Sequence, residues 1–179
     1  MSVDHTETLP EGARPVSAPD APALRIRRSP AVPMPRRAHP DDAGLDLASA
    51  EEVEIPAGGR ALVDTGLAVA LPEGTVGMVC PRSGLAARHG ITVLNGPGIV
   101  DAGYRGPVKV ALHNTDPSEP FTVRVGDRIA QLVVVPFLAP RLEEVEDLDA
   151  TARAEAGFGS SGGFGGSAGP SGAHERTEG

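Results

Sequence analysis

The sequence predicts an all-β fold, either an antiparallel barrel or a jelly roll. Between Leu24 and about Leu142, short runs rich in Val, Ile and Leu are separated at regular intervals by Pro, Gly and Asp. The 40% hydrophobic fraction contains one Tyr, four Phe and no Trp, and small branched side chains favour a pleated sheet. In one run, Val108, Val110 and Leu112 occupy every second position, as in a half-buried strand.

The positions of Pro, Gly and Asp mark the ends of the expected strands and of one helical turn. Only residues 85–89 have the character of a helical turn. The expected strands, in chain order, are residues 24–28, 46–55, 60–71, 75–80, 91–94, 106–114, 121–125 and 128–138. This content favours a closed or two-layered β-domain over any α/β arrangement.

The 179 residues have room for one domain with tails, because domains most often contain roughly 100–150 residues. Residues 1–22 are rich in Pro, Ala and acidic groups without periodicity, and we expect a disordered leader there. Residues 23–148 form the predicted β-domain. Residues 149–179 are dominated by Gly, Ser and Ala, which predicts a flexible C-terminal arm.

The charge and the cysteine content exclude several classes of protein. A net charge of −8 argues against a nucleic-acid or membrane-surface partner, since phosphate backbones attract clustered Lys and Arg. The single Cys80 cannot form an internal disulfide, and the first thirty residues lack the apolar run of a secretory signal. We therefore expect a cytoplasmic protein. The five histidines show no metal-ligand spacing.

Three glycine-containing clusters place charged or hydroxyl side chains at turns, where the backbone can approach a ligand. They are followed by a fourth polar segment and then by the Gly-rich tail. The clusters are residues 43–47 (AGLDL), 81–85 (PRSGL) and 95–106 (NGPGIVDAGYRG), and the fourth segment is residues 126–131 (GDRIAQ). In content and order these segments match the five motifs of the trimeric deoxyuridine triphosphatase (dUTPase) family, which the chain resembles over about residues 24–165.

The resemblance implies a dUTPase-like β-clip, a jelly roll or distorted β-barrel that forms a homotrimer. Three active sites would lie at subunit interfaces, and each Gly-rich arm would close over a neighbouring subunit's site. The implied reaction is Mg²⁺-assisted hydrolysis of dUTP to dUMP and pyrophosphate, by in-line attack of water on the α-phosphate. Such an enzyme limits uracil incorporation into DNA and supplies dUMP for dTMP synthesis.

The same resemblance implies roles for individual residues in the reaction. Asp101 would be the general base that activates water, since an aspartate is ionised at pH 7. Asp46 would contact Mg²⁺ through a water molecule, in the outer shell of the metal. The triphosphate would be gripped by Arg82, Ser83 and Gly84, with Gln131 as a further polar contact. Asp127 and Arg128 are expected to hold a structural turn.

The hairpin from Asn95 to Tyr104 would recognise the nucleoside, with Tyr104 packed under the deoxyribose. Steric exclusion of the thymine methyl is needed there, because a tolerated methyl supplies only about 1–3 kcal/mol of discrimination. The other residues expected to bind substrate are Ile99, Val100 and Lys109 in the β-domain, and Arg153, Phe158 and Gly159 in the arm. The arm departs from the family pattern by carrying Ala154 and Ala156 where Gly is usual.

Two alternatives remain open at this stage. A dCTP deaminase would share the fold, but that family usually has Trp at the Tyr104 position and a catalytic Glu where this chain has Ala111. Without that carboxylate, deamination has no evident acid–base catalyst. The second alternative is a non-catalytic nucleotide-sensing protein on the same scaffold.

Overall fold

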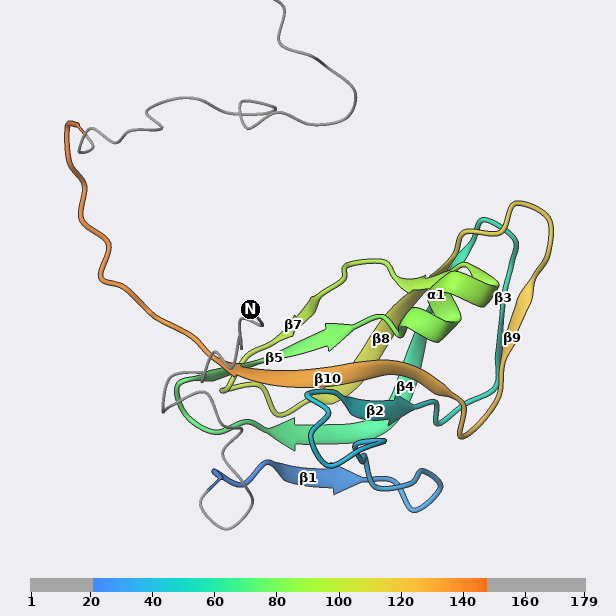
Figure 1. Cartoon of the computed structure of the whole chain (residues 1–179), viewed down its shortest axis with the longest axis horizontal. Helices are drawn as coiled ribbons and strands as arrows, with labels where there is room; N and C mark the ends of the chain where they lie inside the picture. The colour runs from blue at the N-terminus through green and yellow to red at the C-terminus, as the bar shows by residue number, and fades with distance from the viewer. Residues whose placement is uncertain (1–20, 148–179) are drawn as a thin grey trace, which may run out of the picture. The chain divides into compact units, whose positions relative to one another are not determined.

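The computed structural model describes residues 21–147 (Figure 1). The chain divides into two compact units, Met1–Ala139 and Pro140–Gly179. The described part of the second unit, residues 140–147, is exposed and contains no helix or strand. The predicted arm, residues 149–179, and all but the last two residues of the predicted leader lie outside the described residues.

The described part of the first unit consists of strands and one short helix, as Figure 1 shows. This confirms the predicted all-β class. In chain order, the elements are β1 (Arg25–Arg28), β2 (Leu45–Ala48), β3 (Val53–Ile55), β4 (Arg60–Ala70), β5 (Thr75–Cys80), α1 (Ser83–His89), β6 (Ile91–Val93), β7 (Gly98–Val100), β8 (Pro107–Asn114), β9 (Phe121–Val123) and β10 (Arg128–Pro136).

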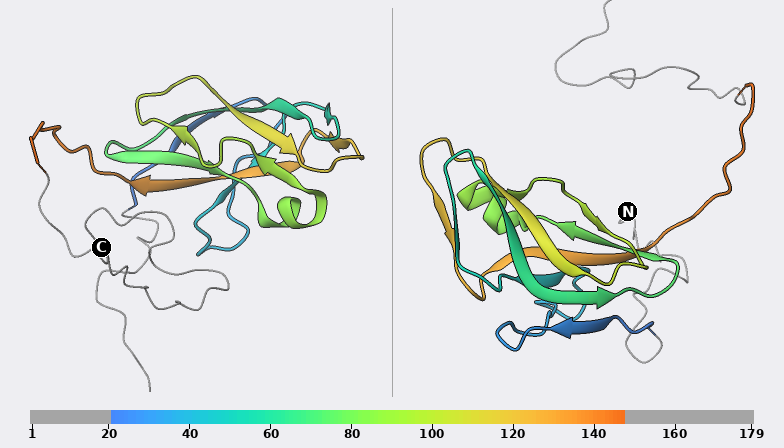
Figure 2. Two further views of the ribbon diagram at one scale, coloured as in Figure 1. Left: turned by 90° about the horizontal axis from the view of Figure 1, so that it is seen from above. Right: turned by 180° about the vertical axis from the view of Figure 1, so that it is seen from behind.

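The strands form two four-stranded antiparallel sheets and a small two-stranded sheet. The first sheet has the order β1-β4-β8-β6, and the second has the order β2-β10-β5-β7. Strands β3 and β9 form the two-stranded sheet at the end of the domain that carries α1, where the ring of Phe121 lies 5.4 Å from that of His89 (Figures 1 and 2). The hydrophobic core takes side chains from both large sheets, including the fully buried Leu47, Val110, Leu112 and Leu132. The core therefore fixes how the two sheets pack.

One predicted strand is wrong, because residues 46–55 form two strands in different sheets. The interruption occurs at Ser49, which is fully buried. Its hydroxyl donates to the carbonyl of Glu51 over 2.6 Å and accepts from the Glu51 N–H over 3.2 Å. A serine side chain that bonds the backbone two residues away stabilises a turn in place of a strand. The chain can then pass from β2 to β3.

The sequence also failed to predict β7, and it began the helix too late. Strand β7 is only three residues long and pairs with β5, with Val100 opposite Gly77. The strand begins at Gly98 and follows Pro97, and both residue types are rare in strands, so strand propensity does not predict it. It forms because it pairs with β5. The helix α1 begins at Ser83 and ends at His89, and the next residue, Gly90, caps it with a φ of 63°, in the left-handed region that favours glycine.

A bulge in β4 changes which residues face the core. The register between β4 and β8 shifts between Asp64 and Leu67. Gly66 has a φ of 64° there, and the neighbouring Thr65 hydroxyl donates to the carbonyl of Val108 over 2.6 Å. Beyond the bulge, Leu67 and Val69 belong to the core. The intervening side chains of this strand end therefore point to the opposite face.

We predict that Asn114→Ala lowers the free energy of unfolding by about 2–3 kcal/mol. Asn114 is fully buried, and its amide donates to the carbonyls of Ile55, Pro56 and Glu119 over 3.3, 3.3 and 2.8 Å. Removing the amide leaves these acceptors without their donor. Urea unfolding measures the change. Glu119→Ala is the control, because it keeps the backbone carbonyl, and an equal loss in both variants would contradict the prediction.

Candidate active site

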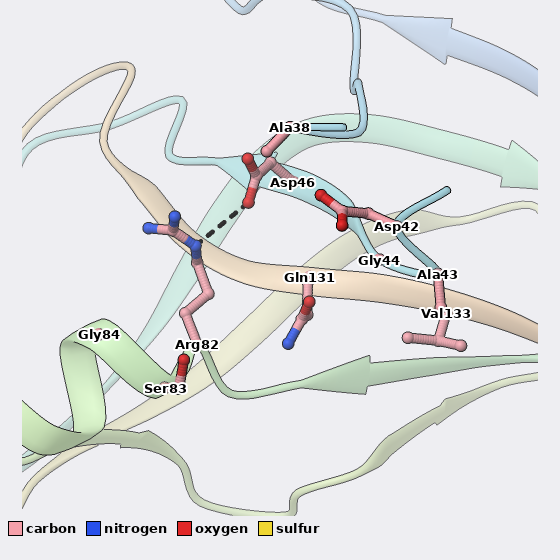
Figure 3. Close-up of a pocket in the computed structure, with 10 residues that line it drawn as sticks. All are labelled: Ala38, Asp42, Ala43, Gly44, Asp46, Arg82, Ser83, Gly84, Gln131 and Val133. Carbon is pink, nitrogen blue, oxygen red and sulfur yellow. Dashed lines mark ion pairs between the residues drawn. The ribbon is translucent and has the colours of Figure 1, made fainter. Parts of the chain in front are cut away.

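A cavity of about 470 Å³ lies where β2, β10 and the start of α1 meet (Figure 3). The loop before β2 forms one wall, and the turn from β5 into α1 forms another. The lining side chains are mostly small or polar. They are Ala38, Asp42, Ala43, Gly44, Asp46, Arg82, Ser83, Gly84, Gln131 and Val133.

Sheet register brings these separate segments together. Asp46 on β2 lies opposite Gln131 on β10, and Gln131 lies opposite Cys80 at the end of β5. Directly opposed residues point to the same face of a sheet, so Asp46 and Gln131 share the cavity face. The chain leaves β5 after Cys80 and places Arg82 beside that row. The structure thus unites the predicted Asp46, Arg82, Ser83, Gly84 and Gln131.

Asp46 is held between two arginines. Its Oδ1 lies 3.1 Å from Nε of Arg82, and its Oδ2 lies 2.9 Å from Nη1 of Arg128. Nη1 of Arg82 also donates to the carbonyl of Arg128 over 3.0 Å. Only 15% of the Asp46 side chain and 26% of the Arg82 side chain are exposed. The carboxylate therefore fixes the direction of the Arg82 guanidinium through a charge-assisted contact.

Arg128 is a residue of the site that the sequence did not predict. Asp127 does hold a turn, since its Oδ2 accepts the N–H of Arg124 over 2.8 Å. Arg128, however, reaches across to Asp46, a contact between residues 82 positions apart. No local pattern signals such a contact. The pairing of β10 with β2 creates it.

Asp42 is a second lining residue that the sequence analysis missed. Its Oδ2 accepts the N–H of His39 over 2.8 Å, which fixes the carboxylate at the wall of the cavity. The only signal in the sequence is its position directly before the Ala43-Gly44 turn. Asp42 therefore adds a carboxylate to the cavity near Gly44 and Gln131 (Figure 3).

Glycine at position 44 leaves room for the observed position of the Gln131 side chain. A Cβ on Gly44 would collide with Oε1 of Gln131, so the amide would have to move. The Gln131 amide donates from Nε2 to the carbonyl of Pro81 over 3.0 Å, which orients Oε1. The glycine thus permits the close packing that aims the amide.

The predicted base lies elsewhere in the chain. Asp101 is exposed and directly follows β7. Extending the pairing of Val100 with Gly77 places it beside Val76 at the start of β5, whereas Arg82 follows the end of β5. Strands advance about 3.3 Å per residue, so Val76 and Cys80 are about 13 Å apart along β5, with Asp101 beside the first and Arg82 beyond the second. A single chain therefore does not bring Asp101 close to Arg82, Ser83 and Gly84, which together form the predicted phosphate grip.

The other predicted nucleoside residues lie along β7 and in the turns on either side of it. Asn95 is exposed, Ile99 is 59% exposed, and Val100 is buried in the core. Tyr104 is 45% exposed, and its hydroxyl donates to the carbonyl of Pro107 over 3.0 Å. Its ring covers Gly106, where a Cβ would lie 2.4 Å from the tyrosine oxygen.

Lys109 is exposed on β8, opposite Asp64 of β4, and is not among the residues lining the cavity. The predicted Arg153, Phe158 and Gly159 lie outside the described residues. Within residues 21–147, no three His, Cys, Asp or Glu residues are grouped to hold a metal ion directly. No helix in that range is long and apolar enough to span a membrane.

The fold and the cavity define a β-sheet protein with guanidinium, hydroxyl and amide groups gathered at one cavity. A family model described as dUTPase matches residues 31–162, a match that continues past the described residues into the arm. The chain belongs to the dUTPase family.

Curated relatives and solved structures agree with this assignment. The chain is 58% identical over 137 residues to a deoxyuridine 5'-triphosphate nucleotidohydrolase of Rhodococcus erythropolis, covering 76% of this chain and 84% of the relative. It is 55% identical over 141 residues to that of Thermobifida fusca, covering 78% and 79%.

Among solved structures, a Staphylococcus bacteriophage 80alpha dUTPase variant with dUpNHpp has 32% identity and a TM-score of 0.73, covering 79% of this chain and 99% of that one. A variant dUTPase from phage phi11 of S. aureus, solved with details of the coordination of a structural Mg(II) ion, has 30% identity and a TM-score of 0.66. It covers 72% of this chain and all of that one (100%).

We predict that Gly44→Ala destabilises the protein by about 1–3 kcal/mol, because the new methyl must displace the Gln131 amide. A crystal structure of the variant should show Gln131 turned away from Pro81. Gly103→Ala is the matched control, since a Cβ there meets nothing within 4 Å. Unchanged stability together with an unmoved Gln131 would refute the packing role of Gly44.

Proposed function

We propose that the chain is a dUTP diphosphatase that hydrolyses dUTP to dUMP and pyrophosphate. The observation that carries this proposal is the convergence of Asp46, Arg82, Ser83 and Gln131 on one cavity of a dUTPase-family chain. In the cell, the enzyme limits uracil incorporation into DNA and supplies dUMP for dTMP synthesis. It acts in the cytoplasm.

The phosphate grip is built around Arg82. Its Nε and one Nη1 proton are directed to Asp46 and to the carbonyl of Arg128. The Nη2 group makes no hydrogen bond to the described part of the chain and can meet a phosphate oxygen. The exposed Ser83 hydroxyl adds a short donor beside it. At Gly84 the first turn of α1 has backbone N–H groups without intrahelical partners, and these can also donate. Fixed donors of this kind stabilise the charge that develops on the leaving pyrophosphate.

The cavity suits a hydrated magnesium ion. Mg²⁺ prefers oxygen ligands and retains several waters, so it needs carboxylates at the wall and substrate oxygens in place of a dense protein cage. Asp42 and the Oε1 atom of Gln131 line the cavity and would hold water molecules of the ion. Asp46 would contact the ion through a water molecule, in its outer shell, since each carboxylate oxygen can accept from a water as well as from an arginine. When bound, Mg²⁺ neutralises charge on the triphosphate oxygens.

Asp101 is the general base of the proposed reaction. Its carboxylate accepts a proton from water as the water oxygen attacks the α-phosphorus in line. The bond from the α-phosphorus to the bridging oxygen breaks, and pyrophosphate leaves with that oxygen. The exposed position of Asp101 after β7 allows it to face a ligand held by another copy of the chain.

The separation of Asp101 from Arg82 supports a site shared between subunits of a homotrimer. In this arrangement one subunit supplies Asp101 and the nucleoside hairpin, and a second supplies the phosphate grip. The arm of a third closes the site, with Arg153 on the γ-phosphate, Phe158 on the uracil ring, and Gly159 permitting close approach. Closure of this kind excludes water other than the attacking molecule.

The hairpin from Asn95 to Tyr104 selects the nucleoside. Backbone groups around Ile99 and Val100 pair with the uracil edge, and the half-exposed Tyr104 ring supports the deoxyribose. The bond from the Tyr104 hydroxyl to Pro107 fixes the ring, which can then exclude a 2′-hydroxyl by contact. Lys109 contributes positive charge at the rim of the shared site.

The alternatives differ in measurable products. A dCTP deaminase would release ammonia from dCTP, but Ala111 on β8 supplies no carboxylate for that chemistry. A nucleotide sensor would bind dUTP without turnover. Incubation of the purified protein with dUTP and Mg²⁺, with dCTP, dTTP and UTP as comparators, separates the three functions by pyrophosphate and ammonia release.

We predict that Asp101→Asn lowers the turnover number for dUTP by about 10²–10⁴-fold, because the amide cannot accept the proton from water. Binding of a non-hydrolysable dUTP analogue should change little, since the side chain keeps its shape. Glu54→Gln, an exposed carboxylate on β3, is the control and should retain full turnover. Retained turnover in Asp101→Asn would remove this residue from the role of base.

Mixing two inactive variants tests whether the site is shared between copies. Asp101→Asn and Arg82→Gln should each be inactive alone. If one copy supplies the base and another the grip, random reassembly of the two leaves about a quarter of sites intact and restores measurable turnover. Mixing after separate folding, without subunit exchange, is the control. Absence of restored activity after verified exchange would place both groups of a site in one chain.

A further inference from the structure

A second hollow, of about 400 Å³, lies on the sheet formed by β1, β4 and β8, away from the residues of the active-site cavity. It is lined by Arg25, Ile26, Arg27, Ala68, Val69, Ala70 and Arg105. Three of these residues carry a positive charge in a chain whose net charge is −8. The hollow is thus strongly basic on an acidic protein.

The register of the sheet explains how the three arginines converge. Arg25 lies opposite Ala70, and Arg27 lies opposite Ala68, so both pairs share one face. Ala68 lies opposite Pro107 of β8, and continuing that pairing by two residues places Arg105 beside Ala70 on the other side of β4. Two arginines therefore flank Ala70, with about 10 Å between their strands.

The alanines form the floor of this hollow. Beyond the bulge in β4, Leu67 and Val69 belong to the core, and the intervening Ala68 and Ala70 lie on the outer face. A long side chain at either position would fill the space between the arginines. The short methyl groups keep it open and let the arginine stems pack against them.

The arginines are available for an anionic ligand. Among residues 21–147, no carboxylate oxygen lies within 4.0 Å of the Arg25, Arg27 or Arg105 guanidinium groups. The nearby Asp64 accepts the N–H of Gly66 over 2.7 Å. Arg105 is fixed through Nη1, which donates to the carbonyls of Ala102 and Tyr104 over 2.6 and 2.7 Å, and within the described range its Nε and Nη2 groups make no hydrogen bond.

We propose that this hollow, the arginine groove, binds a diphosphate group. Guanidinium groups match phosphate oxygens with paired N–H donors, and three of them around a small open space suit a ligand with several phosphate oxygens better than a single carboxylate. The volume falls in the range of small-ligand sites. The diphosphate could come from free pyrophosphate or from the end of a nucleoside triphosphate.

The groove adjoins the hairpin that carries the proposed base. Arg105 directly follows Tyr104, and its two carbonyl contacts are to Ala102 and Tyr104 of that hairpin. An anion held by Arg105 would therefore stiffen the turn between Asp101 and β8. The binding itself is independent of the proposed hydrolysis, because no residue of the arginine groove belongs to the phosphate grip.

Calorimetric titration with pyrophosphate tests the groove directly. The titration uses the full chain carrying Arg82→Gln, without Mg²⁺, so that binding in the active-site cavity is weakened. We expect saturable binding that becomes about tenfold weaker or more when Arg25→Gln or Arg27→Gln is added, as for loss of a charge-assisted hydrogen bond. Addition of Arg124→Gln, an exposed arginine outside the groove, should leave the affinity unchanged.

Ala70→Leu is an independent variant that fills the hollow without changing charge, and it should weaken pyrophosphate binding to a similar degree. ATP in place of pyrophosphate distinguishes the sources: equal affinity assigns the site to the diphosphate end of a nucleotide, and binding of pyrophosphate alone assigns it to the free anion. No binding by the Arg82→Gln chain, or equal loss with Arg124→Gln, would overturn the proposal. Neither result depends on dUTP turnover, so the proposed function stands or fails separately.

Discussion

The site depends on the cross-strand row formed by Asp46, Gln131 and Cys80. Strand β10 lies between β2 and β5, and its register determines which side chains meet on the cavity face. A shift by one residue would turn Gln131 toward the core and Leu132 toward the cavity, because side chains alternate along a strand. Burial of Leu132 in the core prevents that shift. The hydrophobic core thus sets the geometry of the polar site.

Within this frame, Asp46 acts as the point of attachment for two arginines. Its carboxylate holds Arg82 and Arg128, and the backbone carbonyl of Arg128 adds a second contact to Arg82. A long side chain normally loses rotamer freedom when it binds a phosphate. The contacts of Arg82 already restrict its rotamers in the free protein. Binding a phosphate therefore costs less side-chain entropy, because the guanidinium is preorganised.

In one chain, the residues proposed to bind phosphate and the proposed base Asp101 lie apart. The predicted phosphate grip and the carboxylate of Asp42 are at the end of β5, and Asp101 with Tyr104 lies near the start of that strand. A single β-domain cannot fold these ends onto each other, because β5 is an extended strand in the middle of a sheet. Assembly of several copies offers a physical solution, and it would also explain why Asp101, Ile99 and Tyr104 are exposed in one chain.

The sequence by itself determined the β class, most strand positions and the motif residues, because alternation and turn chemistry are local properties. It could not reveal β7, the break at Ser49 or the roles of Asp42 and Arg128. Strand β7 exists through its pairing with β5, and Arg128 meets Asp46 across 82 positions of sequence. Such contacts are decided by tertiary structure, since strand register and the packing of the core select them and no neighbouring residue encodes them.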